Sequence, residues 1–255
     1  MERTRFEAEF GHYTAWIVDA IERLGFCDRI PAACRGTGNP FLLERLAGGL
    51  RIDRGSRVLD VGIGLGGPGA WLAREYSCTV VGIDVMIEAA QGATHLFPDI
   101  SAMVASTRAL PFGDRTFDAA WALGVVEMIA DKKRSFCEIA RVLAPGARVV
   151  LYDFVAIGSI TDVTPMASRF EAGEAIIEKL RESGLEILRA GALPAVPPPP
   201  DDWREPLIAV RERIQVEHSG DERLIVAEEE RNNFNRLRSC GSISEWEFLA
   251  RKAAG

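Results

Sequence analysis

A short apolar segment followed by a dense run of glycines constrains the fold of this chain most strongly. Val58, Leu59 and Val61 are typical of a buried strand, and Asp60 interrupts the apolar run. The segment Ala70–Tyr76 is predicted to be a helix, and glycines lie between strand and helix at positions 62, 64, 66, 67 and 69. Glycine lets the backbone turn sharply and lets a ligand approach it closely. A strand, a glycine turn and a helix in this order predict a ligand site at the end of a parallel sheet.

The glycine spacing fits two kinds of nucleotide site. Gly62-x-Gly64-x-x-Gly67 matches the dinucleotide fingerprint of dehydrogenases, whereas Asp60-x-Gly62-x-Gly64-x-Gly66 matches the pattern of S-adenosylmethionine-dependent methyltransferases. Asp60 favours the second pattern, because a carboxylate before the first glycine can bind an amino-acid ammonium and repels a pyrophosphate. A glycine turn that binds no ligand is the remaining alternative.

A second carboxylate is expected beside this turn. The segment Thr79–Asp84 is predicted to be a buried strand, and it ends in an acid 18 residues after Gly66. A right-handed strand–helix–strand unit places this acid next to the ligand, where it can accept hydrogen bonds from both hydroxyls of a ribose. Alternatively Asp84 caps the predicted helix Ile87–Leu96, and the two roles can coexist.

Helical and strand patterns alternate along most of the chain, which predicts an α/β fold with a parallel, doubly wound sheet. Pro145 and Gly146 are expected to separate a helix from the strand that follows it. Helices are predicted over residues 5–25, 41–49, 70–76, 87–96 and 132–143. Strands are predicted over residues 58–61, 79–84, 102–105, 119–123, 148–154, 185–190 and 244–251.

The composition changes after residue 193. Pro194–Pro200 is rich in proline and must be extended, and two amphipathic helical patterns follow it before the last strand. A long insertion at this edge of such a sheet is usually functional, so residues 194–240 are interpreted as a helical lid, with a dimer contact as the alternative. The expected organisation is one domain: a helical cap (1–54), a cofactor-binding core (55–193 and 241–255) and the lid.

The charge and cysteine content exclude several classes of function. The formal net charge is −7 and no stripe of Lys and Arg is present, which disfavours nucleic-acid binding. Five scattered cysteines without a C-x-x-C pair indicate neither a metal site nor disulfides, and reduced thiols suit a cytoplasmic protein. The sequence shows no signal peptide and no run long enough to span a membrane. A homodimer is compatible with the sequence.

Four segments in order together resemble the class I S-adenosylmethionine-dependent methyltransferases: VLDVGIGLGGPGAWLA, VVGIDVM, LPFGDRTFDAAWALGVVEMI and CEIARVLAPGARVVLYDF. The GLGGPGAWLA form of the turn is similar to the small-molecule branch, which includes tocopherol, sterol, glycine/sarcosine and bacterial natural-product methyltransferases. The resemblance covers Gly55–Phe154 and, more loosely, the carboxyl end. It implies a Rossmann-like sheet of seven strands with the last strand antiparallel, S-adenosylmethionine as the cofactor and a small-molecule acceptor.

The resemblance also implies two sets of cofactor contacts. The residues implied to hold or face the methionine part are Asp60, Gly62, Ile63, Gly64, Gly66 and Leu123. The residues implied to hold the ribose and adenine are Asp84, Val85, Met86, Ser106 and Thr107.

The chain departs from the family pattern in two places. Ser106 stands where members often have an Asp for the adenine amino group, so a hydroxyl or the Thr107 backbone must serve. Gly124 and Met128 stand where many members have Glu and His, so the usual histidine base is absent. Glu127 is the nearest ionisable group and is interpreted as a catalytic base or substrate anchor, with a solvated residue at a helix start as the alternative.

The expected function is methyl transfer from S-adenosylmethionine to an O, N or C atom of a small molecule, by in-line displacement in a closed pocket. A base is required only when the acceptor arrives protonated. The alternatives are a non-catalytic S-adenosylmethionine-binding partner subunit and a nicotinamide-dependent oxidoreductase. The oxidoreductase is disfavoured because none of the three tyrosines has a lysine four residues later.

Overall fold

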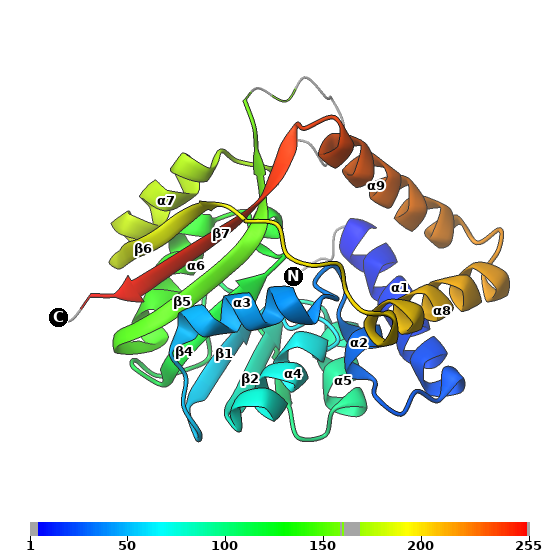
Figure 1. Ribbon diagram of the computed structural model, residues 1–255, viewed down its shortest axis with the longest axis horizontal. Helices are drawn as coiled ribbons and strands as arrows, with labels where there is room; N and C mark the ends of the chain where they lie inside the picture. Colours follow the sequence, from blue (N-terminus) through cyan, green and yellow to red (C-terminus); the bar gives the residue numbers. More distant parts are fainter. Residues whose placement is uncertain (1–4, 159, 161–168, 254–255) are drawn as a thin grey trace.

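One mixed sheet of seven strands organises the computed structural model, which describes residues 5–158, 160 and 169–253 (Figure 1). The strand order is β3-β2-β1-β4-β5-β7-β6. The strands are β1 (Arg57–Val61), β2 (Thr79–Asp84), β3 (Ser101–Val104), β4 (Phe117–Leu123), β5 (Leu143–Ala156), β6 (Leu185–Ala192) and β7 (Ile243–Lys252).

The first five strands are parallel, and β7 runs antiparallel to both of its neighbours, β5 and β6. This confirms the doubly wound sheet and the antiparallel last strand. The strand order reverses between β1 and β4, so the carboxyl ends of β1, β2 and β4 meet at the point where ligands bind in open α/β sheets.

The helices that surround this sheet come from both halves of the chain. Those of the first half are α1 (Arg5–Leu24), α2 (Ile30–Ala33), α3 (Pro40–Leu50), α4 (Gly67–Tyr76) and α5 (Ile87–Leu96). Those of the second half are the 3₁₀ turn η1 (Val126–Met128), α6 (Lys132–Val142), α7 (Gly173–Glu182), α8 (Asp201–Glu217) and α9 (Glu222–Ser239). None of the described helices is long and apolar enough to cross a membrane.

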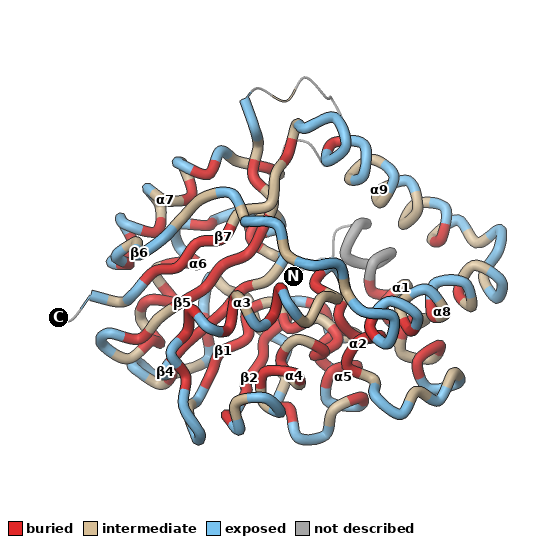
Figure 2. The backbone as a smooth tube through the Cα atoms, viewed as in Figure 1, coloured by how far each residue is buried: buried red, intermediate tan, exposed pale blue. Residues whose placement is uncertain are grey.

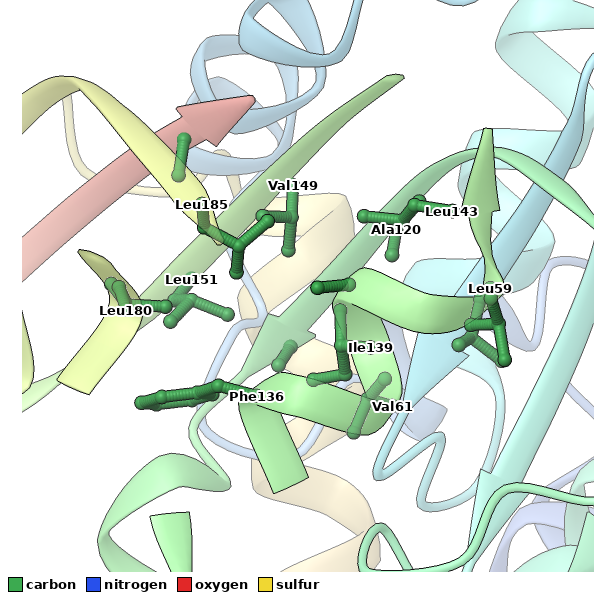
Figure 3. Packing of buried hydrophobic residues seen from close by; sticks show 14 of the residues in the cluster. Leu59, Val61, Ala120, Phe136, Ile139, Leu143, Val149, Leu151, Leu180 and Leu185 are labelled. Carbon is green, nitrogen blue, oxygen red and sulfur yellow. The ribbon is translucent and has the colours of Figure 1, made fainter. Parts of the chain in front are cut away.

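Each face of the sheet is covered by its own helices. On one face Phe136 and Ile139 of α6 and Leu180 of α7 pack against side chains of β1, β4 and β5 (Figure 3). On the other face α3, α4 and α5 cover the sheet, with Leu43 and Leu72 fully buried. The central strands are therefore buried on both sides, whereas the residues of α9 are mostly exposed or intermediate (Figure 2).

A further, smaller core joins α1, α8 and α9 to the glycine turn. Ile21 of α1, Ile214 of α8 and Leu224 of α9 are buried together with Leu65, which belongs to the glycine turn itself. The aromatic ring of Trp16 on α1 stacks on His218, with ring centroids 3.9 Å apart and an interplanar angle of 11°. The N-terminal helices and the α8–α9 insertion thus form one helical unit beside the turn.

Several element boundaries differ from the sequence prediction, and three of these differences have a local explanation or mark a longer strand. The helix α4 begins at Gly67 rather than Ala70, because Pro68 is favourable in a first helical turn. The strand β4 begins at Phe117, two residues before the predicted start. Pro145 and Gly146 do not separate helix from strand: β5 begins at Leu143, and an irregularity in its pairing with β4 accommodates them.

Candidate cofactor site

The glycine turn after β1 has a backbone that requires its glycines. Gly62, Gly64 and Gly66 have φ values of +75°, +53° and +81°, a region that residues with a Cβ rarely adopt. At Gly62 a Cβ would also lie 2.6 Å from a methyl carbon of Val125. The alternate glycines of the motif are thus explained by the backbone alone, and they leave the turn open at the carboxyl ends of the strands.

Asp60 is buried beneath this turn. Its side chain is 3% exposed, and its Oδ2 has no hydrogen-bond partner among the described residues. A Cβ at Gly69 would lie 2.9 Å from Oδ2, so this glycine of α4 makes room for the carboxyl group. Burial raises the pKa of Asp60 to about 7, while the Trp121 indole, opposite Asp60 on β4, lowers it in part. The turn therefore holds a carboxyl group with unused capacity to bind a cation.

Asp84 ends β2 and connects that strand to the glycine turn. Its Oδ2 accepts a hydrogen bond from the Gly64 amide at 3.0 Å, and its Oδ1 accepts one from the Met86 amide at 2.9 Å. Met86, not Asp84, is the N-cap of α5, so the alternative role of Asp84 as the N-cap residue of that helix is not observed. Burial raises the pKa of Asp84, although the backbone hydrogen bonds oppose this shift. Each oxygen retains a lone pair for a ligand hydroxyl.

A cavity of about 240 Å³ opens beside Asp84. Five of the predicted site residues line it: Gly62, Asp84, Val85, Ser106 and Thr107. The other predicted side chains lie elsewhere: Ile63 packs over Gly82, Met86 is buried, and Leu123 packs against the core under α3 and α4. A larger cavity, of about 420 Å³, lies between α3, α4 and Trp203 and includes none of the predicted site residues.

Ser106 and Thr107 use their hydroxyls within the protein. The Oγ of Ser106 accepts from the Arg108 amide at 3.3 Å, and the Oγ1 of Thr107 is 2.7 Å from the Oγ of Ser135 on α6. Both residues line the cavity after β3, where the resemblance places the adenine edge. Their hydroxyls order the wall of the cavity and can each accept one more hydrogen bond.

Glu127 does not line this cavity, although its neighbour Met128 does. The half-buried side chain of Glu127 lies within hydrogen-bonding reach of the Asp153 carboxyl at the end of β5. Burial and the nearby Glu127 carboxyl raise the pKa of Asp153 well above its usual range. The alternative interpretation of Glu127, as a solvated residue at a helix start, does not describe this position, because its Oε2 is fully buried.

The sequence interpretation missed a cation next to Asp84. Arg35, between α2 and α3, donates from Nη1 to the Thr14 hydroxyl at 3.0 Å and lies 5.4 Å from the centre of the Tyr13 ring. Burial lowers the pKa of Arg35 to about 10, so the guanidinium stays charged, and its field acts on Asp84. Its sequence context, Cys34-Arg-Gly-Thr-Gly, predicts only a turn, so no local signal marked this arginine.

Comparisons with known proteins agree with this arrangement. The family model "Methyltransferase domain" matches residues 59–151. Methyltransferase GfsG of Streptomyces halstedii is 37% identical over 128 residues, covering 48% of this chain and 46% of the relative. The 27-O-demethylrifamycin SV methyltransferase of Amycolatopsis mediterranei is 33% identical over 162 residues, covering 57% and 59%. The chain thus spans about half the length of these curated relatives.

The similarity to solved structures extends over most of the chain. The crystal structure of the [4+2]-cyclase SpnF superposes with a TM-score of 0.67 at 25% sequence identity, covering 84% of this chain and 81% of that one. The strand order, the glycine turn, the acid at the end of β2 and the matched family model agree with one another. The chain is therefore similar to the class I S-adenosylmethionine-dependent methyltransferases, and residues 59–151 match their methyltransferase domain.

Proposed function

We propose that this protein transfers a methyl group from S-adenosylmethionine to a small-molecule acceptor. The observation that carries the proposal is the orphaned Oδ2 of Asp60, which lies under a glycine turn next to Asp84. A buried carboxyl oxygen without a partner is costly unless a ligand satisfies it. An amino-acid ammonium is such a ligand, whereas a pyrophosphate would be repelled. This favours S-adenosylmethionine over a nicotinamide dinucleotide.

The described residues fit the parts of this cofactor. Asp60 and the backbone of the glycine turn would bind the methionine ammonium, and Asp84 would accept the ribose hydroxyls. Arg35 would attract the methionine carboxylate, because its guanidinium is charged and lies within electrostatic range of Asp84. The adenine would occupy the cavity lined by Val85 and Ser106.

Methyl transfer depends on the alignment of acceptor, methyl group and sulfur more than on acid catalysis. When bound, S-adenosylmethionine supplies a methyl group on a cationic sulfur, and the leaving group is neutral. The protein therefore has to fix the acceptor opposite the sulfur and exclude water from the site. Leu65 anchors the glycine turn in the helical core and so helps to fix one side of this alignment.

We infer that α8 and α9, within the predicted lid 194–240, cover the acceptor side, and that the N-terminal cap 1–54 supports them. Phe234 of α9 packs edge-on against Phe154 of β5, with ring centroids 4.7 Å apart, and Phe170 lies beside both. This places an aromatic wall over the carboxyl end of β5, next to η1. Such a wall suits an apolar acceptor rather than a small charged one.

We infer that the methylated atom is a hydroxyl oxygen of an apolar natural product. The relatives include proteins named as O-methyltransferases, from Aspergillus sclerotiorum and Penicillium expansum, and the acceptor side is aromatic. Another relative is named as an N-methyltransferase for glycine, sarcosine and dimethylglycine, so the nitrogen alternative needs its own test.

The test is incubation of the full chain with methyl-labelled S-adenosylmethionine and a panel of acceptors. The panel pairs apolar alcohols and phenols with the amines of the same carbon skeleton, and glycine and sarcosine serve as charged acceptors. We expect label in the hydroxyl compounds together with one S-adenosylhomocysteine per methyl group. The Asp84→Ala variant is the control for cofactor-dependent transfer.

Two results would contradict the proposal. Tight binding of S-adenosylmethionine without any label transfer would indicate a non-catalytic partner subunit. Conversion of an acceptor without incorporation of label would indicate a different reaction on the same fold, and the structural neighbour named as a [4+2]-cyclase illustrates that case.

A further inference from the structure

Two carboxyl groups lie close together where β5 meets η1: Asp153 belongs to β5 and Glu127 belongs to η1. Asp153 is 1% exposed, and its Oδ2 accepts hydrogen bonds from the amides of Val126 at 2.5 Å and Glu127 at 3.2 Å. Its Oδ1 accepts a bond from the Phe154 amide at 2.6 Å. Asp153 therefore caps the η1 turn, the other side of which lines the cofactor cavity.

The partner carboxyl belongs to the turn that Asp153 caps. Glu127 lies in η1, reaches the Asp153 carboxyl, and has an Oε2 that is fully buried without a hydrogen-bond partner among the described residues. Two ionised carboxylates cannot share such a place without strong repulsion, because the local dielectric is low. One shared proton removes the repulsion and gives the two groups a hydrogen bond.

The charged side chains described near the Glu127–Asp153 pair form hydrogen bonds and ion pairs with other residues. Lys132, at the start of α6, donates to the Ile129 carbonyl at 3.0 Å and pairs with Glu171 at 3.1 Å. On the opposite face of β5 the Tyr152 hydroxyl donates to Glu245 at 3.0 Å, and Glu245 also pairs with Arg238. Glu245 thus has a hydrogen-bond donor and a cationic partner, whereas the side-chain neighbour of the Asp153 carboxyl is the Glu127 carboxyl.

Arg169 is a further cation near η1. Its guanidinium approaches the Met128 sulfur at 3.7 Å and pairs with Glu230 of α9 at 3.7 Å. It therefore links η1 to α9 and offsets the charge of Glu230. The carboxyl pair and this link both involve η1, and Met128 of η1 also lines the cofactor cavity.

We propose that Glu127 and Asp153 hold one proton between them and work as a unit, in which Glu127 takes the acceptor's proton and Asp153 is the positioning residue. This proposal rests on the proposed methyl transfer. As the acceptor heteroatom bonds the methyl carbon, the carbon–sulfur bond breaks with its electron pair left on sulfur. The acceptor's hydrogen leaves as a proton and binds the singly charged pair, which becomes neutral. Burial and the like charge raise the pKa of Asp153, in agreement with a retained proton.

The first test measures the shared proton and needs no acceptor. The unfolding equilibrium constant is determined at pH 6 and pH 9 for the wild type, Glu127→Gln, Asp153→Asn and the double variant. A raised pKa in the folded state means that stability falls as pH rises, so the wild type should lose stability over this interval. Between pH 6 and pH 9, the unfolding equilibrium constant of each single variant should change at least tenfold less than that of the wild type. The double variant should differ from the single variants by no more than a further threefold.

The matched control is Glu245→Gln, because Glu245 is a carboxyl on the neighbouring strand β7 with a hydrogen bond to Tyr152. It should retain the pH dependence of the wild type. Infrared spectra at pH 8 should show a protonated carboxyl band that is weaker in both single variants but not in this control. Additive effects of the two substitutions, or unchanged infrared bands, would overturn the shared proton.

The second test separates positioning from folding. Asp153→Asn keeps an oxygen that accepts from the η1 amides and loses only the acceptor of the Phe154 amide, so it should retain methyl transfer within tenfold, whereas Asp153→Ala loses both acceptors and should lose at least a hundredfold. Glu127→Gln should lower kcat at least tenfold while the Kd for S-adenosylmethionine stays within threefold. Equal losses in Asp153→Asn and Asp153→Ala would contradict the positioning role. If no acceptor is methylated, the proposed function fails, but the proton experiment still decides whether the pair exists.

Discussion

The amide of Gly64 donates a hydrogen bond to Asp84 Oδ2 at 3.0 Å, which fastens the glycine turn after β1 to the end of β2. The same carboxylate therefore has two functions in our account. It orders the turn before the cofactor arrives, and it offers its remaining lone pairs to the ribose hydroxyls. Pre-ordering of this kind reduces the entropy that binding must overcome.

Replacement of Asp84 tests this double role. Asp84→Ala should weaken S-adenosylmethionine binding at least tenfold, because the ribose hydroxyls lose their acceptor and the Gly64 amide loses its partner. Titration calorimetry with the purified variant measures the effect. Asp99→Ala, at an exposed acid after α5, is the matched control and should bind like the wild type. Unchanged affinity in Asp84→Ala would remove this residue from the site.

The buried acid Asp60 should make the unliganded protein less stable as the pH rises. Because burial raises the pKa of Asp60 from 3.8 to about 7, its contribution to stability is complete below pH 4 and is lost as the pH passes 7. The shift corresponds to at most about 4 kcal/mol. Urea unfolding at pH 5 and pH 8 should therefore show a smaller loss of stability in Asp60→Asn than in the wild type, and an identical loss would contradict this assignment.

Gly69 should tolerate no side chain, although it lies in a helix. A Cβ there would lie 2.9 Å from Asp60 Oδ2 and 3.2 Å from a methyl carbon of Val80. We expect Gly69→Ala to destabilise the protein by about 1–3 kcal/mol and to weaken cofactor binding. Gly48→Ala is the control: nothing lies within 4 Å of its added Cβ in α3, so it should stabilise by about 0.5–1 kcal/mol. Thermal unfolding of both variants measures the difference, and equal melting temperatures of Gly69→Ala and Gly48→Ala would contradict the predicted clash at Gly69.

The helical unit around α8 and α9 should be loosened by one aromatic substitution. Trp16 of α1 stacks on His218. Arg223, in the first turn of α9, has its guanidinium 4.9 Å from the centre of the Trp16 ring. Trp16→Ala should accelerate proteolysis within residues 194–240 and lower kcat/KM for the acceptor at least tenfold. Cofactor affinity should change less than threefold. If kcat/KM for the acceptor and the affinity for the cofactor fell by the same factor, the helical unit would support the cofactor site rather than cover the acceptor.

A complete deletion of residues 194–240 is a poorer test, and the structure explains why. Trp203, Ile214 and Leu237 of this segment are buried, two of them in cores shared with the first half of the chain. The deletion would expose those cores to water, at about 25 cal/mol for each Å² uncovered. Loss of activity would then report unfolding rather than loss of a lid.

The fold was predictable because the sequence patterns that indicate its strands and helices are local and periodic. The strand before Gly62 and the acid at Asp84 follow from apolar runs and glycine spacing, and the structure places them as expected. The irregular start of β5 was not predictable, because Pro145 and Gly146 are tolerated by a pairing defect that depends on β4. Tertiary pairing overrode the local signal there.

The site was predictable only in part, for the same physical reason. Asp60 and Asp84 stand at strand ends, where topology alone brings them together. Arg35 acts electrostatically on Asp84 from a loop that has no sequence periodicity, and Asp153 meets Glu127 across 26 residues through the β4–β5 pairing. Such contacts exist once the sheet is assembled and leave no local pattern.

The binding of S-adenosylmethionine to Asp60 is the central claim, and proton release on binding tests it most directly. A carboxyl with a pKa of about 7 is mostly protonated at pH 6, and pairing with an ammonium requires its ionised form. Calorimetry at pH 6 in two buffers of different ionisation enthalpy should therefore show release of about 0.9 proton per cofactor bound, falling to about 0.1 at pH 8. The Asp60→Asn variant should release almost none at either pH. Equal proton release by the wild type and Asp60→Asn at pH 6 would contradict the account.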